Sequence, residues 1–206
     1  MKTFPVMLKM CGRIAVVVGG GKVGLRKAHA LRSAEARVRL IARDIPDGAD
    51  IEGLELVKGD YSQNLLDGAF AVFACTDDAE LNSQIARDGR DAGAIVNVAD
   101  KPGECDFFMP AVITDGELVI SVGTGGASPA LAAELRDKIS KTLPPRIGEF
   151  TSLAGDIRSE LNSREISQPQ RTKILKNLAN EQTLAIFLEG GPDAVRHRIE
   201  RMISEP

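Results

Sequence analysis

Three glycines near the start of the chain have a spacing that can bind phosphate. Gly19, Gly21 and Gly24 form the pattern G-x-G-x-x-G, after an apolar β-branched run and before a helix-forming segment. In that setting the first glycine permits a tight turn, the second lets a pyrophosphate approach, and the third lets the helix pack closely. We therefore predict that a dinucleotide binds at Gly19, Gly20, Gly21, Lys22, Val23 and Gly24. The alternative is a glycine-rich turn that binds nothing.

Three further residues are candidates for binding the adenosine part of the cofactor. An NAD site usually has an acidic residue at the end of its second strand, but that position falls near Ala42 here. Asp44 can hold the ribose from a longer turn, while Arg43 can stack on adenine or accept a 2′-phosphate. The alternative for both is a solvated turn. Thr76 is expected on the adenine side, and we expect a modest preference for NAD over NADP.

One carboxylate stands where it can act on a substrate. Asp100 directly follows the fifth apolar segment and precedes Lys101-Pro102-Gly103. A carboxylate near a nicotinamide can take up a proton or orient a substrate N–H while hydride leaves. Spacing alone, however, favours a turn-forming aspartate. No metal site is expected, because the two histidines and the three cysteines are far apart in the sequence.

The elements that must position these residues alternate between strands and helices. Apolar segments at 14–18, 36–42, 54–58, 69–75 and 94–99 are typical of strands, and 79–92 is typical of a helix. Alternation at these lengths indicates βαβ units and a parallel sheet, so we predict a Rossmann-like α/β domain. Because ligands bind beyond the carboxyl ends of such strands, the candidate residues are expected at one edge.

The pattern changes after residue 106. Two strands at 107–114 and 117–122 flank an Asp-Gly turn, and a glycine-rich loop leads to a helix capped by Ser128 that runs to about residue 141. Four helices are then expected at 150–162, 169–180, 183–188 and 192–203. The predicted fold is therefore a Rossmann-like domain followed by a small α+β region and a helical tail.

Composition limits the functional classes. The chain has 206 residues, a hydrophobic fraction of 43% and a net charge of −3, as an ordinary globular protein does. No apolar run reaches a membrane-spanning length, and no export signal is apparent. We therefore expect a cytoplasmic protein that binds neither membrane nor nucleic acid.

Six motifs in this order resemble one family. They are Phe4-Pro5-Val6-Met7-Leu8 with Gly12-Arg13, the run Val17 to Ala28, Ala74-Cys75-Thr76-Asp77-Asp78 with Leu81-Asn82, Asn97-Val98-Ala99-Asp100, Cys105-Asp106-Phe107, and Thr124-Gly125-Gly126-Ala127-Ser128-Pro129. The chain is similar to precorrin-2 dehydrogenase, also called sirohydrochlorin ferrochelatase, the N-terminal module of sirohaem synthase. The resemblance covers about residues 4–145, and beyond that the tail fits only in length and helical character.

The resemblance implies a function and a domain plan. The function is NAD-dependent oxidation of precorrin-2 to sirohydrochlorin, with insertion of Fe²⁺ or Co²⁺ as a further activity in some members. The plan is a homodimer with a Rossmann domain at 1–113, a dimerisation region at 114–147 and a helical domain at 148–206.

The resemblance also implies site residues. It makes Asp100 the catalytic aspartate, and it suggests substrate contacts from Asn97, Lys101, Thr124, Gly125, Gly126 and Ser128. Two departures concern Lys101, where many members have another residue, and Gly24, where many have alanine; glycine in place of alanine is expected to be harmless.

Two rival functions stay open. A Rossmann regulatory subunit that senses a nucleotide without catalysis would suit the segment 74–78, but such subunits usually carry a clear acidic residue after the second strand. The other rival is a protein whose main activity is metal chelation, which the sequence does not separate from dehydrogenation.

Overall fold

The computed structural model describes residues 2–204 and divides them into two compact units, one ending at Met109 and one beginning at Pro110. The division lies before the predicted end of the first domain at residue 113. The further division of the second unit at residue 147 stays a prediction.

The first unit is built on five parallel strands. In chain order these are β1 (Ile14–Val18), β2 (Arg37–Ala42), β3 (Glu55–Lys58), β4 (Ala69–Ala74) and β5 (Ile95–Val98). Their order in the sheet is β3-β2-β1-β4-β5. The chain therefore runs outward from β1 to β3 and crosses back to β4 on the other side of β1. This doubly wound sheet confirms the predicted Rossmann-like fold.

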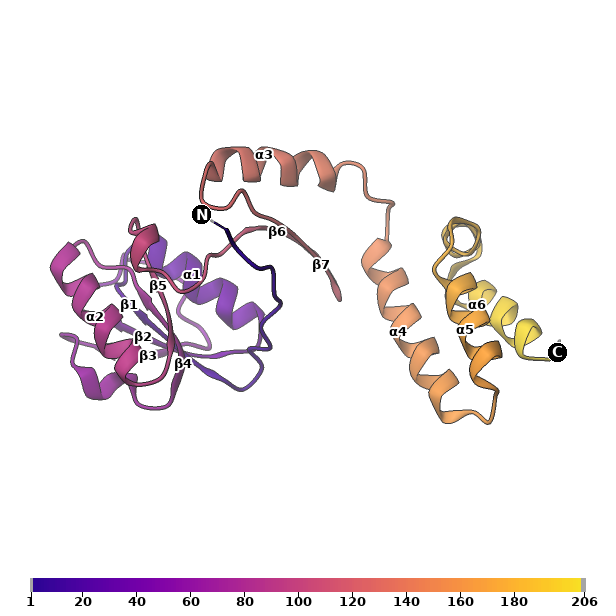
Figure 1. Cartoon of the computed structure of the whole chain (residues 1–206), viewed down its shortest axis with the longest axis horizontal. Helices are drawn as coiled ribbons and strands as arrows, with labels where there is room; N and C mark the ends of the chain where they lie inside the picture. Colours follow the sequence, from indigo (N-terminus) through magenta and orange to yellow (C-terminus); the bar gives the residue numbers. More distant parts are fainter. Residues whose placement is uncertain (1, 205–206) are drawn as a thin grey trace. The chain divides into compact units, whose positions relative to one another are not determined.

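The two faces of β1 carry the two halves of the core. Ala15 and Val17 point toward helix α1 (Lys22–Ser33), whereas Val16 and Val18 lie in the core beneath helix α2 (Ala79–Asp91). Figure 1 shows these helices on opposite sides of the sheet. Because both faces of the strand are covered, all four side chains are buried, which explains the continuous apolar run in the sequence. Short 3-10 helices form at Gln63–Leu66 and Pro102–Glu104.

A hairpin and a helix begin the second unit. Strands β6 (Ala111–Asp115) and β7 (Leu118–Val122) are antiparallel, and helix α3 (Pro129–Ser140) follows the glycine-rich loop. β6 starts later than predicted because Phe107 belongs to the first unit, where its ring packs edge-on against Phe73 with centroids 5.4 Å apart.

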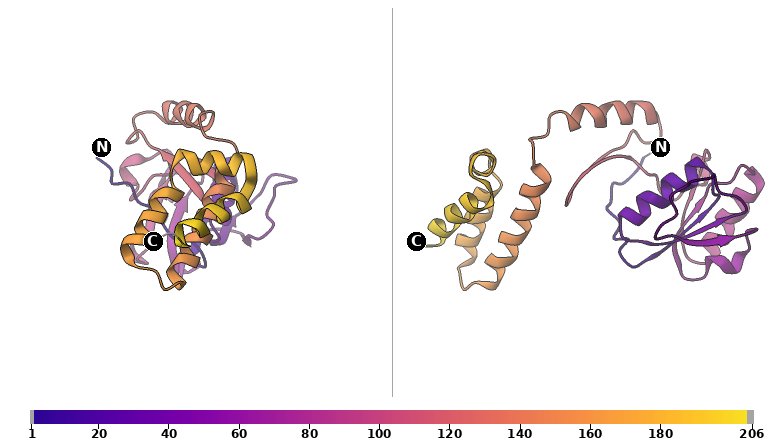
Figure 2. Two further views of the ribbon diagram at one scale, coloured as in Figure 1. Left: turned by 90° about the vertical axis from the view of Figure 1, so that its right-hand side faces the viewer. Right: turned by 180° about the vertical axis from the view of Figure 1, so that it is seen from behind.

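Three helices complete the second unit: α4 (Ile147–Ser163), α5 (Gln168–Leu178) and α6 (Glu181–Ser204). Figure 2 shows these three helices packed against one another, and their shared core includes Phe150, Ile157, Ile174 and Phe187. α6 replaces the two predicted helices at 183–188 and 192–203, but it bends at Gly191, whose φ is 72°, immediately before Pro192. The predicted interruption is therefore present as a kink, because a left-handed glycine and a proline together interrupt helical hydrogen bonding.

Candidate functional site

The loop between β1 and α1 is shaped by its glycines. Gly19 has a φ of 116°, and a Cβ there would collide with the carbonyl oxygen of Cys75. Glycine is thus required both by the backbone angle and by the close approach of the two loops. At Gly21 a Cβ would meet no atom within 4 Å, so this side of the loop is open to a ligand.

Gly24 lies where the first turn of α1 meets the glycine loop. A Cβ at this position would collide with the carbonyl oxygen of Gly19, because the first turn of α1 packs directly against the loop. The close helix packing that the spacing predicts is therefore present. Alanine at Gly24 would require the loop to move on this backbone.

A cavity of about 620 Å³ lies at the carboxyl edge of β1, β2 and β4. Its size is typical of a small-molecule site. Eight of the nine residues predicted to bind the cofactor line it, and Gly24 lies behind the loop instead. The cavity is lined by Gly19, Gly20, Gly21, Lys22, Val23, Arg43, Asp44, Thr76 and, among residues not predicted, Asp60, Tyr61, Asp77 and Asp78.

The unpredicted residues Asp60 and Tyr61 follow β3, the short edge strand. Asp60 Oδ1 lies 3.8 Å from Arg43 Nε, and both side chains are exposed. Tyr61 donates a hydrogen bond to Asp88 at 2.8 Å, and its pKa is raised by burial and by that carboxylate. Their position in the sequence could have predicted that they line the cavity, because they directly follow the third strand. The carboxyl ends of parallel strands lie at the same edge of the sheet.

The loop after β4 is held by its own polar groups. Asp78 caps α2 by accepting hydrogen bonds from the backbone N–H groups of Glu80 and Leu81, at 2.8 and 3.0 Å. These bonds, assisted by the nearby Arg43 charge, hold the pKa of Asp78 below its usual range. The Thr76 hydroxyl lies 2.8 Å from the side-chain oxygen of the buried Asn82. Thr76 therefore lines the cavity with a side chain that is already fixed in place.

Asp100 lies in the turn after β5 and is exposed. It is not among the residues that line the cavity. Its φ is 59°, in the left-handed region that non-glycine residues seldom adopt, although aspartate and asparagine tolerate it better than most. Asn97, three residues earlier, is buried within β5.

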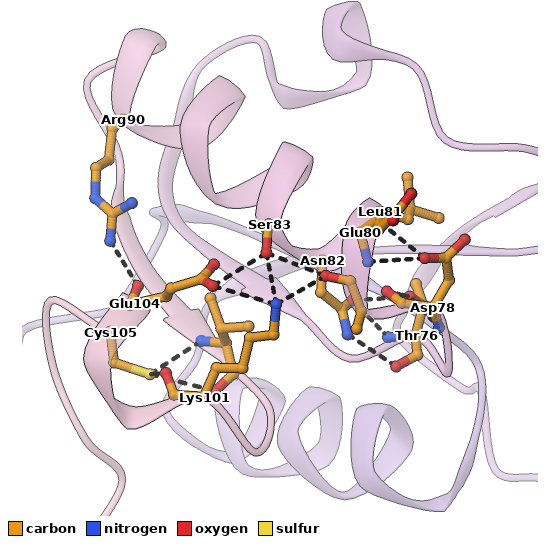
Figure 3. A network of polar contacts seen from close by, with 12 residues as sticks. Thr76, Asp78, Glu80, Leu81, Asn82, Ser83, Arg90, Lys101, Glu104 and Cys105 are labelled. Atoms are coloured by element: carbon orange, nitrogen blue, oxygen red, sulfur yellow. Dashed lines mark hydrogen bonds and ion pairs between the residues drawn. The ribbon is translucent and has the colours of Figure 1, made fainter.

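Lys101 is engaged inside the first unit. Its Nζ donates hydrogen bonds to the Ala79 carbonyl at 3.0 Å and to Ser83 Oγ at 2.7 Å, and it lies 3.2 Å from a carboxylate oxygen of Glu104 (Figure 3). Ser83 also bonds to Glu104 at 3.1 Å. This network ties the Asp100 turn to the first turn of α2. The suggested contact between Lys101 and substrate stays a prediction that competes with these bonds.

The remaining predicted substrate residues belong to the second unit. Thr124 Oγ1 donates to the Ser128 carbonyl at 3.0 Å and accepts from the Ser128 N–H at 3.1 Å. Ser128 Oγ caps α3 by accepting from the Leu131 N–H. Gly125 and Gly126 have φ values of 61° and 82°, so glycine suits both positions. Their contact with substrate stays a prediction.

Residues 2–204 contain neither a cluster of metal ligands nor a membrane-spanning helix. No group of three or more His, Cys, Asp or Glu side chains is placed to hold a metal ion. No helix in this part of the chain has the length and apolar character needed to cross a membrane.

Comparison with known proteins gives a consistent set of relatives. A family described as "Putative NAD(P)-binding" matches residues 6–111. A siroheme synthase from Pseudomonas paraeruginosa is 32% identical over 208 residues, covering 99% of this chain and 45% of the relative. One from Citrobacter koseri is 32% identical over 211 residues, covering 100% and 46%. The chain thus spans about half the length of the curated relatives it matches.

A solved structure shows the same fold. The structure titled "SirC, precorrin-2 dehydrogenase" superposes with a TM-score of 0.80 at 21% sequence identity, and the match covers 97% of this chain and 100% of that one.

Proposed function

We propose that this chain oxidises precorrin-2 to sirohydrochlorin. It belongs to the NAD(P)-binding family and is related along its full length to siroheme synthases. The overall reaction consumes precorrin-2 and NAD⁺ and yields sirohydrochlorin, NADH and a proton. The observation that carries the proposal is the cavity of about 620 Å³ at the sheet edge, with an exposed aspartate on the neighbouring strand.

The shape of the loop fits a dinucleotide. The open side of Gly21 leaves room for a pyrophosphate, and α1 begins at Lys22 with no side-chain cap on its first N–H groups. Free N–H groups and the positive end of the helix dipole attract phosphate oxygens. Gly19, Gly20, Gly21, Lys22 and Val23 would hold the pyrophosphate.

The charges at the other end of the cavity favour NAD. Arg43 is the basic side chain placed for a 2′-phosphate, but it lies beside Asp60, and Asp44 and Asp78 line the same cavity. The carboxylates that share the cavity with this guanidinium would repel a 2′-phosphate, whereas a carboxylate can accept hydrogen bonds from ribose hydroxyls.

Asp100 would serve the proton half of the reaction. When bound, NAD supplies a hydride acceptor for a carbon of the macrocycle. The oxidation also releases a proton, and a carboxylate at the end of β5 can accept it and pass it to water because its side chain is exposed. Asp100 would thus be the catalytic base or proton relay.

A homodimer is part of the proposal. Exposed apolar side chains in the second unit support it: Val112 and Val119 on the hairpin are 41% and 42% exposed, and Leu131 on α3 is 51% exposed. Val112 and Val119 lie on the same face of the hairpin, because Val112 is opposite Ser121 and Thr114 is opposite Val119, so one partner surface would cover both. A cytoplasmic location, expected from the sequence, also remains part of the proposal.

The test supplies the purified chain with precorrin-2 and NAD and follows NADH absorbance and the tetrapyrrole spectrum. We expect NADH and sirohydrochlorin to form in equal amounts. Binding of NAD without turnover would instead support the regulatory subunit, and the absence of both would contradict the proposal. Adding Fe²⁺ or Co²⁺ afterwards shows whether metal is also inserted as a second substrate.

A further inference from the structure

Lys27 is a buried cation whose position the proposed chemistry does not yet explain. Four polar residues are buried within residues 2–204, namely Lys27, Asn82, Asn97 and Thr183, and of these Lys27 alone carries a charge. It is 8% exposed, and no carboxylate of the described chain lies within ion-pair distance of it. Burying an unpaired ammonium is costly, and an apolar side chain of similar length would fill the same space. The buried charge therefore points to a role beyond filling space.

The Lys27 ammonium is aimed at one acceptor. Its Nζ donates to Asn97 Oδ1 at 2.5 Å and lies 5.6 Å from the centre of the Phe73 ring. Burial raises the pKa of the neighbouring Cys75 thiol, and the Lys27 charge opposes that rise. The ammonium thus reaches from α1 across the end of β4 to β5.

This contact fixes the orientation of the Asn97 amide. An ammonium can only donate, so the amide oxygen must face Lys27 and the amide nitrogen must face the other way. There the Nδ2 donates to the Phe107 carbonyl at 2.8 Å. Asn97 therefore joins the strand before the Asp100 turn to the segment after it.

Groups of Cys105 and Asp106 also close the same turn. The Val98 N–H donates to Cys105 Sγ at 3.2 Å, and the Val96 N–H donates to the Asp106 carboxylate at 2.8 Å. Neither contact involves α1. Lys27 thus connects α1, the helix that follows the glycine loop, to the strand directly before the Asp100 turn.

We propose that Lys27 is a positioning residue for the oxidation, acting through Asn97 to hold the Asp100 turn in place relative to the glycine loop. The expected fall in kcat rests on the proposed function, whereas the expected change in hydrogen exchange does not. It concerns a residue that would touch neither the cofactor nor the substrate.

The test compares Lys27→Met, the double variant Lys27→Met/Asn97→Leu and the control Lys173→Met, which removes an exposed lysine from α5. Hydrogen–deuterium exchange of peptides covering residues 98–107 is measured together with NAD affinity, melting temperature and kcat. In Lys27→Met we expect faster exchange in this segment, unchanged exchange in α2, and unchanged NAD affinity. We expect kcat to fall about 10- to 100-fold, since a displacement of about 1 Å can cost 100-fold.

The double variant separates positioning from folding. Replacing both partners by apolar side chains leaves neither an unpaired ammonium nor an unpaired amide oxygen, and only the part-buried Phe107 carbonyl loses its donor, so the melting temperature should fall little. If Lys27 acts through Asn97, kcat of the double variant should be no higher than in Lys27→Met alone, because restoring the polar balance does not restore the contact with α1.

Two outcomes would overturn the inference: exchange in residues 98–107 of Lys27→Met that matches the wild type, or faster exchange with an unchanged kcat. If the wild type does not oxidise precorrin-2, the proposed function fails. The exchange measurement then still decides whether Lys27 holds the turn.

Discussion

The ammonium group of Lys101 lies 2.7 Å from the hydroxyl of Ser83 and donates a hydrogen bond to it. This bond connects the loop after β5 to α2, and it makes Lys101 a candidate for either of two roles. A substrate ligand would lower the KM for precorrin-2, whereas a loop anchor would support kcat by holding the Asp100 turn.

Removing this ammonium therefore gives the first prediction. We expect Lys101→Met to lower kcat about tenfold with little change in KM, because the loop loses three contacts to α2 and Glu104. Ser83→Ala should act in the same direction and more weakly. Steady-state kinetics with precorrin-2 checks both. A large rise in KM with kcat unchanged would instead assign Lys101 to substrate binding.

Gly21 should be essential for the cofactor. Gly21→Asp places a carboxylate on the open side of the loop, where it would repel a pyrophosphate by contact and by charge. We expect calorimetry to detect no NAD binding, with the circular dichroism spectrum unchanged. Gly155→Asp, at an exposed position of α4 with open space around the Cβ, is the matched control. Unchanged affinity in Gly21→Asp would show that the loop does not bind phosphate.

The Asp100→Asn variant tests the proton step. Asparagine tolerates the φ of 59° and keeps the size of the side chain, but it cannot accept a proton at neutral pH. NADH formation should fall by about two to four orders of magnitude, the range that general-base catalysis contributes, while NAD affinity is kept.

Chelation gives this variant a second measurement. If metal insertion into sirohydrochlorin falls together with oxidation, one carboxylate serves both reactions. If insertion persists, other groups take the pyrrole protons. Wild-type rates for both reactions would make Asp100 only a turn residue.

Cofactor choice should depend on Arg43. We expect NAD to be preferred over NADP in the wild type, because Asp44, Asp60 and Asp78 share the cavity with this single guanidinium. Arg43→Ala should weaken NADP binding further and change NAD affinity much less. Dissociation constants for both dinucleotides check this. A wild-type preference for NADP that Arg43→Ala abolishes would reverse the assignment.

Acid should weaken a contact at the surface of the first unit. Asp50 accepts two hydrogen bonds from Arg32, at 2.7 and 3.2 Å, and one from the Glu52 N–H, and these lower its pKa to about 2. Because the folded-state pKa lies below the unfolded one, the carboxylate stabilises the fold above about pH 4, and this contribution disappears as the pH falls toward 2.

Melting temperatures of the wild type and Asp50→Asn as a function of pH check this prediction. The wild type should melt higher at pH 6, and the two curves should converge below about pH 4. A difference that persists at pH 2 would mean that the charge of Asp50 is not what stabilises the contact.

The sheet and the glycine loop could be predicted because their signals are local. The run Val16–Val17–Val18 predicts a strand that is buried on both faces. The glycines after it predict a turn in which larger side chains would clash. The alternation of strands and helices indicates parallel strands joined by crossover connections, whereas the order β3-β2-β1-β4-β5 comes from the structure.

Other features could not be predicted because they depend on where long side chains end. Lys27 shares the buried face of α1 with Leu25, Ala28 and Leu31, and periodicity does not reveal whether a lysine there bends to solvent or remains inside. Lys101 follows Asp100 in a turn, and nothing in the spacing indicates that its ammonium reaches back to α2.

The contacts that close the Asp100 turn also protect the sheet from self-association. β5 is an edge strand, and edge strands offer unpaired backbone groups to which another chain can add. Here the outward N–H and C=O groups of Val96 are paired with Asp106, and those of Val98 are paired with the Cys105 thiol. A chain that unfolds only this segment would expose a ready template for strand addition. Loosening the turn should therefore appear first as aggregation during storage, before any loss of the folded core.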